Sequence, residues 1–110
     1  MFTSYFAKAS DDPNAVAISR GTPTNYSGRV YMPLAPPWEL INLYKINEDE
    51  EIYRNHYQHL ILNNLDPLMT YKELGEDAIL LCWEGRNKFC HRRIVADWFE
   101  RELNIEVPEL

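Results

Sequence analysis

The sequence lacks several features that would assign it at once to a class of protein. It has only two cysteines in 110 residues, too few for the disulfide framework of a small secreted protein. No run approaches the roughly 20 apolar residues of a membrane span. We expect no signal peptide, because no N-terminal segment has a basic start followed by a long apolar stretch. We therefore expect a cytoplasmic protein without a membrane span, whose thiols stay reduced.

Positive charge is also scarce. The chain has 11 Lys and Arg residues against 17 Asp and Glu residues, which gives a net charge of -6. Broad binding to duplex DNA depends on Lys and Arg that neutralise phosphates, so we do not expect it. The remaining composition, 45% hydrophobic and 25% charged, is typical of a globular protein. The length predicts a single domain over residues 1–110.

The stretch from Ala78 to Arg93 carries most of the residues that can do chemistry. Residues 78–83 form an unbroken apolar run, which predicts a buried strand. The run turns polar after Trp83, and from Phe89 onwards apolar residues recur at helical spacing. The pattern predicts a strand, a tight loop and a helix. The loop holds a carboxylate, two sulfur atoms, an imidazole and several guanidinium groups.

The rest of the chain predicts an α/β fold, one compact domain with a small, mostly parallel sheet flanked by helices. Strands are expected at 2–6, 15–19 and 78–83. Helices are expected at 38–46, 48–63 and 90–103, the second of them capped by Asn47. Three prolines make residues 24–37 irregular, and the tail would add a short strand through Ile105 and Val107. The strands at 15–19 and 78–83 should pair in parallel.

Polar residues follow two of these strands, at the edge where open α/β sheets bind ligands. A site is therefore expected where this edge meets the start of the last helix. The candidate catalytic residues are Glu84, Cys90 and His91. The candidate ligand-binding residues are Ser19, Arg20, Cys82 and Arg92.

Two kinds of chemistry fit the start of the last helix. The first is an anion site, because a helix N-terminus offers free N–H groups and Arg92 adds a planar guanidinium. Its alternative is an arginine that is solvated or paired with a carboxylate. The second is a reactive thiol at Cys90, stabilised by His91 and Arg92. Neighbouring helical residues diverge by about 100°, however, and a small buried hydrophobe is the alternative for Cys90.

A metal centre is a third kind of site that residues of this stretch could form. Cys82, Cys90 and His91 would supply three ligands for zinc, but the spacing C-x7-C-H matches no usual paired pattern and no fourth ligand is evident. We therefore predict no metal and no cofactor. A disulfide between Cys82 and Cys90 is disfavoured in the cytosol.

The order of short motifs along the chain resembles a known family. The motifs are Thr3-Ser4-Tyr5-Phe6, Ile18-Ser19-Arg20 with Pro23, Leu34-Ala35-Pro36, Tyr44-Lys45, Leu80-Leu81-Cys82-Trp83-Glu84 and Cys90-His91-Arg92. Together they are similar to the uncharacterised proteins grouped as domain of unknown function 488 (DUF488). The resemblance implies a compact α/β domain of bacterial or phage origin, with no settled activity. It also implies functional roles for the seven candidate residues. Pro37 and Trp83 depart mildly from the family pattern.

We expect the site to bind a small anionic molecule, a nucleotide or another phosphate. Arg20 and Arg92 would hold the anion, and Glu84 would act as an acid or base or orient the ligand. Whether such a protein is an enzyme stays open. The alternative is a protein–protein interaction module that uses residues 31–38 as its surface. In that reading the Cys90-His91-Arg92 motif is a structural latch.

Overall fold

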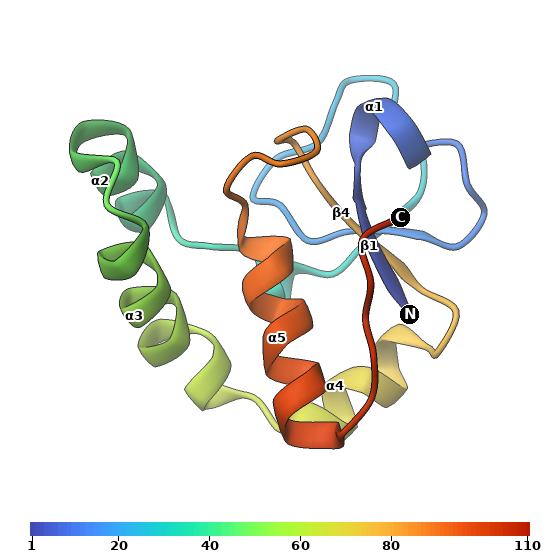
Figure 1. Ribbon diagram of the computed structural model, residues 1–110. Coiled ribbons are helices and arrows are strands. Elements are labelled where there is room, and N and C mark those ends of the chain that lie inside the picture. Colours follow the sequence, from blue (N-terminus) through green and yellow to red (C-terminus); the bar gives the residue numbers. More distant parts are fainter.

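The structure, a computed structural model that describes all 110 residues, is an α/β fold around one sheet (Figure 1). Its strands are β1 (Phe2–Tyr5), β2 (Ala15–Ala17), β3 (Arg29–Val30) and β4 (Ile79–Cys82). They lie in the order β1-β4-β2-β3, and all neighbours are parallel. The predicted fold class is confirmed, as is the parallel pairing of 15–19 with 78–83.

Five α-helices and two 3-10 turns surround the sheet. The helices are α1 (Phe6–Ala9), α2 (Trp38–Asn47), α3 (Glu50–Leu60), α4 (Pro67–Leu74) and α5 (His91–Leu103). The 3-10 turns are η1 (Met32–Leu34) and η2 (Leu62–Asn64). In Figure 1, α5 stands between the sheet and the pair formed by α2 and α3. None of these helices combines the length and the apolar composition that a membrane span requires.

The helix expected at 48–63 is shorter than predicted at both ends. Asn47 does not cap it, because Asn47 is the last residue of α2. Asp49 is the N-cap instead, and its carboxylate accepts a hydrogen bond from the Ile52 N–H at 3.0 Å. Two acceptable capping residues lie two positions apart, and the choice between them depends on where α2 ends.

Three segments near the sheet edges also differ from the expectation. The first strand ends at Tyr5, because Phe6 begins the short helix α1. Residues 29–30, expected to be irregular, form the edge strand β3, which is too short and too exposed to leave an apolar pattern. The tail pairs with β1 through Glu109 and Thr3, four residues beyond Ile105.

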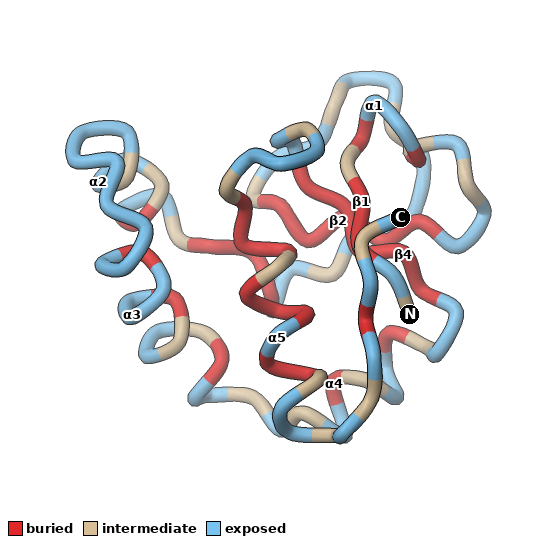
Figure 2. The backbone as a smooth tube through the Cα atoms, in the orientation of Figure 1, coloured by how far each residue is buried: buried red, intermediate tan, exposed pale blue.

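The sheet separates two hydrophobic cores of unequal size. Figure 2 shows that the buried residues are concentrated in the strands of the sheet and in α5. Val16 and Leu80 face the larger core, which also holds buried residues of α3, α4 and α5. Ile79 and Leu81 face the smaller core beneath α1. Because side chains alternate along a strand, Cys82 points to the same side as Leu80, towards α5. This direction brings the end of β4 to the start of α5.

Candidate functional site

A pocket of about 450 Å³ lies where β2 and β4 end and α5 begins. Its walls come from the segments that follow β2 and β4, from the residues that lead into α5, and from α2 and α3. The lining includes six of the seven candidate residues, which are Ser19, Arg20, Cys82, Glu84, Cys90 and His91. Arg92 is the exception. The structure therefore brings the candidates together at the predicted sheet edge.

Cys82 and Cys90 are joined by a disulfide at the floor of this pocket. Cys82 is the last residue of β4 and Cys90 is the N-cap of α5. Both are buried, with 2% and 8% of their surface exposed. The bond corrects the expectation of two reduced thiols. The loop between them folds back, so that residues eight positions apart meet although their spacing matches no paired motif.

His91 is held by its hydrogen bond to the backbone. Its Nε2 lies 2.7 Å from the carbonyl oxygen of Ile18. A carbonyl oxygen only accepts, so Nε2 carries the proton in the neutral ring and Nδ1 has a free lone pair. Burial lowers the pKa of His91 to about 4; the Ile18 carbonyl opposes this shift and the positive charge of Arg92 adds to it. The imidazole is therefore neutral at pH 7.

The free Nδ1 of His91 faces the sulfur of Cys90 at 3.7 Å. Their neighbouring positions in the sequence argued against such a contact, because successive helical residues diverge. Cys90 is not yet helical, however, since its φ and ψ of -153° and 147° are those of an extended chain. The turn from extended to helical backbone lets the two side chains meet.

Arg92 does not line the pocket, and its guanidinium lies in a cluster of polar groups that includes the sulfur of Cys82. Its Nε and Nη2 donate to the two carboxylate oxygens of Glu109 at 3.1 and 2.9 Å. Nη1 donates to the carbonyl of Glu84 at 2.7 Å and to the sulfur of Cys82 at 3.1 Å. Nη2 also donates to the carbonyl of Gly85 at 3.2 Å. We refer to Arg92, Glu109 and these acceptors as the Arg92 cluster.

The Arg92 cluster leaves no donor of the guanidinium free for a ligand. An arginine has five N–H groups, and the five hydrogen bonds occupy them all. Arg92 is only 1% exposed, and its face lies 5.7 Å from the ring centre of Tyr5. Arg92 has no free donor for an anion. Its contacts are all within the chain, as expected of a structural latch.

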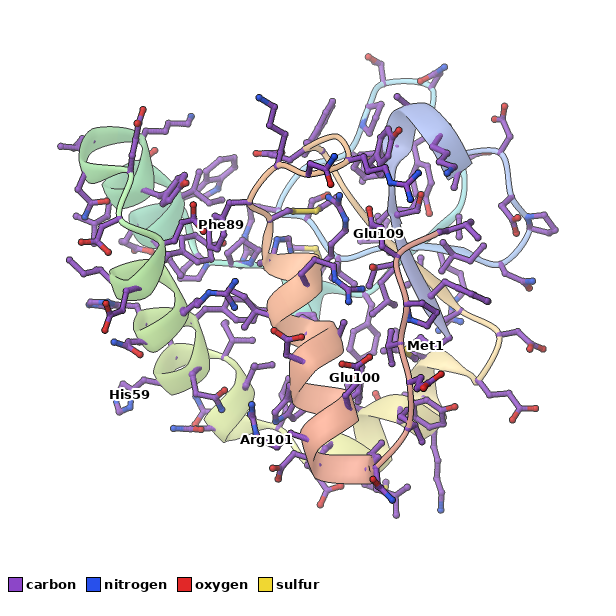
Figure 3. The ribbon with its side chains drawn as sticks, viewed as in Figure 1. Met1, His59, Phe89, Glu100, Arg101 and Glu109 are labelled. Atoms are coloured by element: carbon purple, nitrogen blue, oxygen red, sulfur yellow. A yellow bond between two sulfur atoms is a disulfide. The ribbon has the colours of Figure 1, made fainter.

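Glu109, the carboxylate of this cluster, was not among the residues expected from the sequence. Burial alone would raise the pKa of Glu109, but hydrogen bonds from Arg92 and Thr3 outweigh burial and hold the pKa below its usual value. Nothing in the tail sequence signals this role, because the contact spans 17 positions. Figure 3 shows Glu109 on the C-terminal tail and Phe89 on the opposite side of α5.

Arg20 lines the pocket and keeps part of its guanidinium free. Its Nε and Nη2 donate to the carbonyls of Pro36 and Ala35 at 3.0 and 3.2 Å, which leaves Nη1 without an acceptor in the chain. Ser19 is buried and donates to the carbonyl of Gly21 at 2.6 Å. These bonds fix the loop after β2. Arg20 is therefore anchored at the pocket wall, with Nη1 not bonded to the chain.

The pocket walls are aromatic, and none of these aromatic residues is among the seven candidates from the sequence. Five rings line it, those of Trp38, Tyr44, Tyr53, Trp83 and Phe89. The rings of Tyr44 and Phe89 stack with centres 5.1 Å apart. Trp83 is oriented by its indole N–H, which donates to the carbonyl of Gly21 at 2.9 Å. Aromatic residues at positions 38 and 44 of a helix next to the Pro36-Pro37 turn were the available signal.

Two charged side chains complete the lining. Lys45 is an exposed cation on α2 that forms no ion pair with the chain. Glu84 is an exposed carboxylate that follows β4. Burial raises the pKa of Tyr53, and the negative charge of Glu84 raises it further, so the phenol stays protonated. The pocket therefore offers cations, a carboxylate and phenol groups between flat apolar walls.

The chain matches the model of a known protein family. The family DUF488-N3a, described as the active DUF488-N3 subclade, matches residues 7–103. The chain belongs to this family. The matched range of DUF488-N3a includes every lining residue of the pocket, but it excludes Glu109 of the Arg92 cluster. No curated protein and no solved structure matches the chain significantly.

Proposed function

We propose that the pocket binds a small anionic molecule that carries a flat ring, of which a nucleotide is the class that fits best. The lining carries this proposal, because five aromatic rings surround a cavity that also presents Arg20 and Lys45. Bases stack on aromatic side chains, and arginine and lysine bind phosphate. Ligand pockets commonly combine apolar walls with a few polar groups, and 450 Å³ is within their usual range.

The two cations divide the work in this proposal. Arg20 is anchored to the backbone and would offer Nη1 to the anion from a fixed position. Lys45 is unpaired and flexible, and would follow the phosphate as a point charge. Arg92 takes no part, because its donors are occupied within the chain. Glu84 would orient the ligand or act as an acid or base at the mouth of the pocket.

The tryptophans provide a direct binding assay. Trp38 and Trp83 line the pocket, whereas Trp98 is buried on α5. Titration with a nucleoside, with its mono- and triphosphates and with inorganic phosphate should change the fluorescence for the nucleotides. Trp38→Phe should remove part of that change. An unchanged fluorescence with every phosphate compound, together with no thermal stabilisation, would contradict the proposal.

Lys45→Ala tests the anion half of the proposal. We expect nucleotide affinity to fall about tenfold, which corresponds to about 1.4 kcal/mol. Lys72→Ala is the matched control, since Lys72 is also an exposed lysine on a helix but lies on α4, outside the pocket. Equal affinities for the two variants would show that the pocket does not recognise the anion through Lys45.

Glu84→Gln separates a binding protein from an enzyme. The substitution keeps the size of the side chain and removes its charge. If a bound nucleotide is converted to a product, we expect the variant to keep binding and to lose turnover. Loss of binding as well would make Glu84 a recognition residue. The word active in the description of DUF488-N3a supports a search for products, for example by mass spectrometry.

A second candidate is a protein-binding surface over residues 31–38, favoured by its exposed apolar side chains. Met32 and Trp38 are 43% and 57% exposed, and Ile46 on α2 is 83% exposed. Such a surface predicts association, which sedimentation at rising protein concentration would detect for a second copy of the chain. Met32→Ser should weaken association without affecting nucleotide binding, since Met32 belongs to this surface but is outside the pocket lining.

A further inference from the structure

Three potential metal-ligating atoms meet at the floor of the pocket. The sulfur atoms of Cys82 and Cys90 and a ring nitrogen of His91 all lie within 4.8 Å of one another. All three residues are buried, at 2%, 8% and 5% exposure. They also line the pocket, so the cluster is sealed from the core side and open towards the cavity. Figure 3 shows sulfur atoms, drawn in yellow, at the start of α5.

His91 is oriented as metal-ligating histidines are. Its Nε2–H donates to the carbonyl of Ile18 at 2.7 Å, which fixes both the tautomer and the plane of the ring. A ligating imidazole usually gives its second nitrogen to a carbonyl or carboxylate in this way. The free Nδ1 then points at the sulfur of Cys90 at 3.7 Å. An ion bound by Nδ1 would therefore need no movement of the ring.

Positively charged or polarised groups lie beside both sulfur atoms. Nη1 of Arg92 donates to the sulfur of Cys82 at 3.1 Å. Cys90 is the N-cap of the 13-residue helix α5, where the helix dipole favours negative charge. Thiolate is the form of cysteine that binds metals. Two thiolates would also balance the charge of a divalent ion beside the positive Arg92.

We propose that the reduced protein binds one zinc ion through the sulfur atoms of Cys82 and Cys90 and Nδ1 of His91. Two thiolates and an imidazole suit zinc, which is usually four-coordinate. The fourth position faces the pocket and would take water or a ligand atom. Zinc sites with three protein ligands and one open position are typical of catalysis, whereas structural sites use four.

The disulfide and the ion exclude each other. A thiol reductant supplies two electrons and two protons to the Cys82–Cys90 bond and leaves as its own disulfide, which yields two thiols. Zinc then displaces both thiol protons and binds the two sulfur atoms. A small-molecule disulfide that accepts two electrons from the pair and two protons from solvent would reform the Cys82–Cys90 bond, leave as two thiols and release the ion. The proposal thus concerns the reduced chain alone, and oxidised protein serves as an internal control.

The zinc site shares the pocket with the proposed nucleotide site but stands on separate contacts. Zinc binding needs neither Lys45 nor the aromatic walls. Nucleotide binding is measured on the oxidised protein, in which the two sulfur atoms cannot ligate an ion. A failure of one proposal therefore leaves the other intact, and the two assays distinguish them.

The test begins with protein that has been reduced with dithiothreitol, stripped of metal and transferred to metal-free buffer without oxygen. Titration with zinc should bind one ion per chain, counted by native mass spectrometry, and should raise the Tm by several degrees. Cobalt in place of zinc should give the absorption bands of a tetrahedral thiolate site. Oxidised protein should bind neither ion. A reduced chain that binds no zinc overturns the proposal.

Variants identify the ligands. Cys82→Ser, Cys90→Ser and His91→Gln should each lower zinc affinity at least tenfold. His56→Gln is the control, because His56 is an exposed histidine on α3 outside the cluster. Circular dichroism establishes that each variant folds. If a variant of the zinc ligands does not fold, the wild-type protein provides a second test. Zinc should protect its Cys82 and Cys90 from alkylation by iodoacetamide. Undiminished zinc affinity in folded variants, or no protection, overturns the proposal.

Discussion

The two sides of the start of α5 use similar residues for different ends. On one side lies the pocket, where Arg20 and Lys45 keep donors without partners in the chain. On the other side lies the Arg92 cluster, where a buried guanidinium has every donor engaged. Cys90 and His91 lie on the pocket side and Arg92 on the other, because a step from one helical residue to the next turns the side chain by about 100°.

The difference shows how to separate a structural charge from one available to a ligand. A buried charge is costly unless its hydrogen bonds are satisfied, so the complete set around Arg92 indicates a role in stability. A cation at a cavity with unused donors costs little, because water hydrates it until a ligand arrives. Substitutions in the Arg92 cluster should therefore lower stability strongly, whereas substitutions of the pocket cations should mainly lower ligand affinity.

Removal of the buried guanidinium should have the largest effect. Arg92→Ala removes the ion-pair partner of Glu109, which keeps only the hydrogen bond from Thr3, and the donor of two backbone carbonyls, so we expect the free energy of unfolding to fall by about 3–5 kcal/mol. Urea denaturation measures this loss. Arg86→Ala, which removes an exposed arginine from the same loop, should change stability by less than about 0.5 kcal/mol. Equal losses in the two variants would refute the latch.

Acid should have the next largest effect, through His91. An unfolded histidine takes up a proton near pH 6.5, whereas folded His91 stays neutral down to about pH 4. Between these values the unfolded chain binds more protons, so stability falls as pH falls, by about 1.4 kcal/mol per pH unit and about 3 kcal/mol in all. Denaturation of the oxidised protein at a series of pH values measures this slope.

The variant His91→Gln provides the control for the acid effect. Glutamine keeps an N–H that can donate to the carbonyl of Ile18 but has no proton to gain in this range. Its stability should change little between pH 6.5 and 4.5, although its overall value is lower. A slope as steep as that of the wild type would assign the acid effect to other groups.

Reduction of the disulfide should have a smaller effect on the metal-free protein. The bond closes a short loop, with a sequence separation of 8. The chain-entropy relation predicts a loss of about 2.5 kcal/mol for a loop of this length. Urea denaturation with and without dithiothreitol, in the presence of a chelator, measures the difference. Cys82→Ser should show no dependence on the reductant, and a similar shift in this variant would point away from the disulfide.

Substitutions at the mouth of the pocket should have the smallest effect on stability. Lys45→Ala and Glu84→Gln remove exposed charges, so each should change the free energy of unfolding by less than about 0.5 kcal/mol. Their effect should appear in ligand binding instead. A loss above about 1 kcal/mol in Lys45→Ala would show that the lysine has a partner within the fold, and would erase the contrast with Arg92.

The sequence by itself determined the class of fold and the edge of the sheet at which the pocket lies. Apolar runs at 15–18 and 78–83 predicted two buried strands, and β2 and β4 lie side by side in the middle of the sheet. Helical periodicity placed α5 directly after the second run. Polar residues that follow such strands must lie at one edge, which is where the pocket is. These conclusions follow from local pattern and from sheet geometry.

Only the tertiary structure decided what each site residue contacts. The direction of Arg92 depends on where α5 begins, and its partner Glu109 comes from the tail that returns beside β1. The contact of Cys82 with Cys90 depends on how the loop folds back. Three of the five aromatic side chains in the pocket walls, Trp38, Tyr44 and Tyr53, come from α2 and α3, which are distant in sequence from Cys82 and Cys90. Such contacts join residues distant in sequence, and no local propensity or periodicity encodes them.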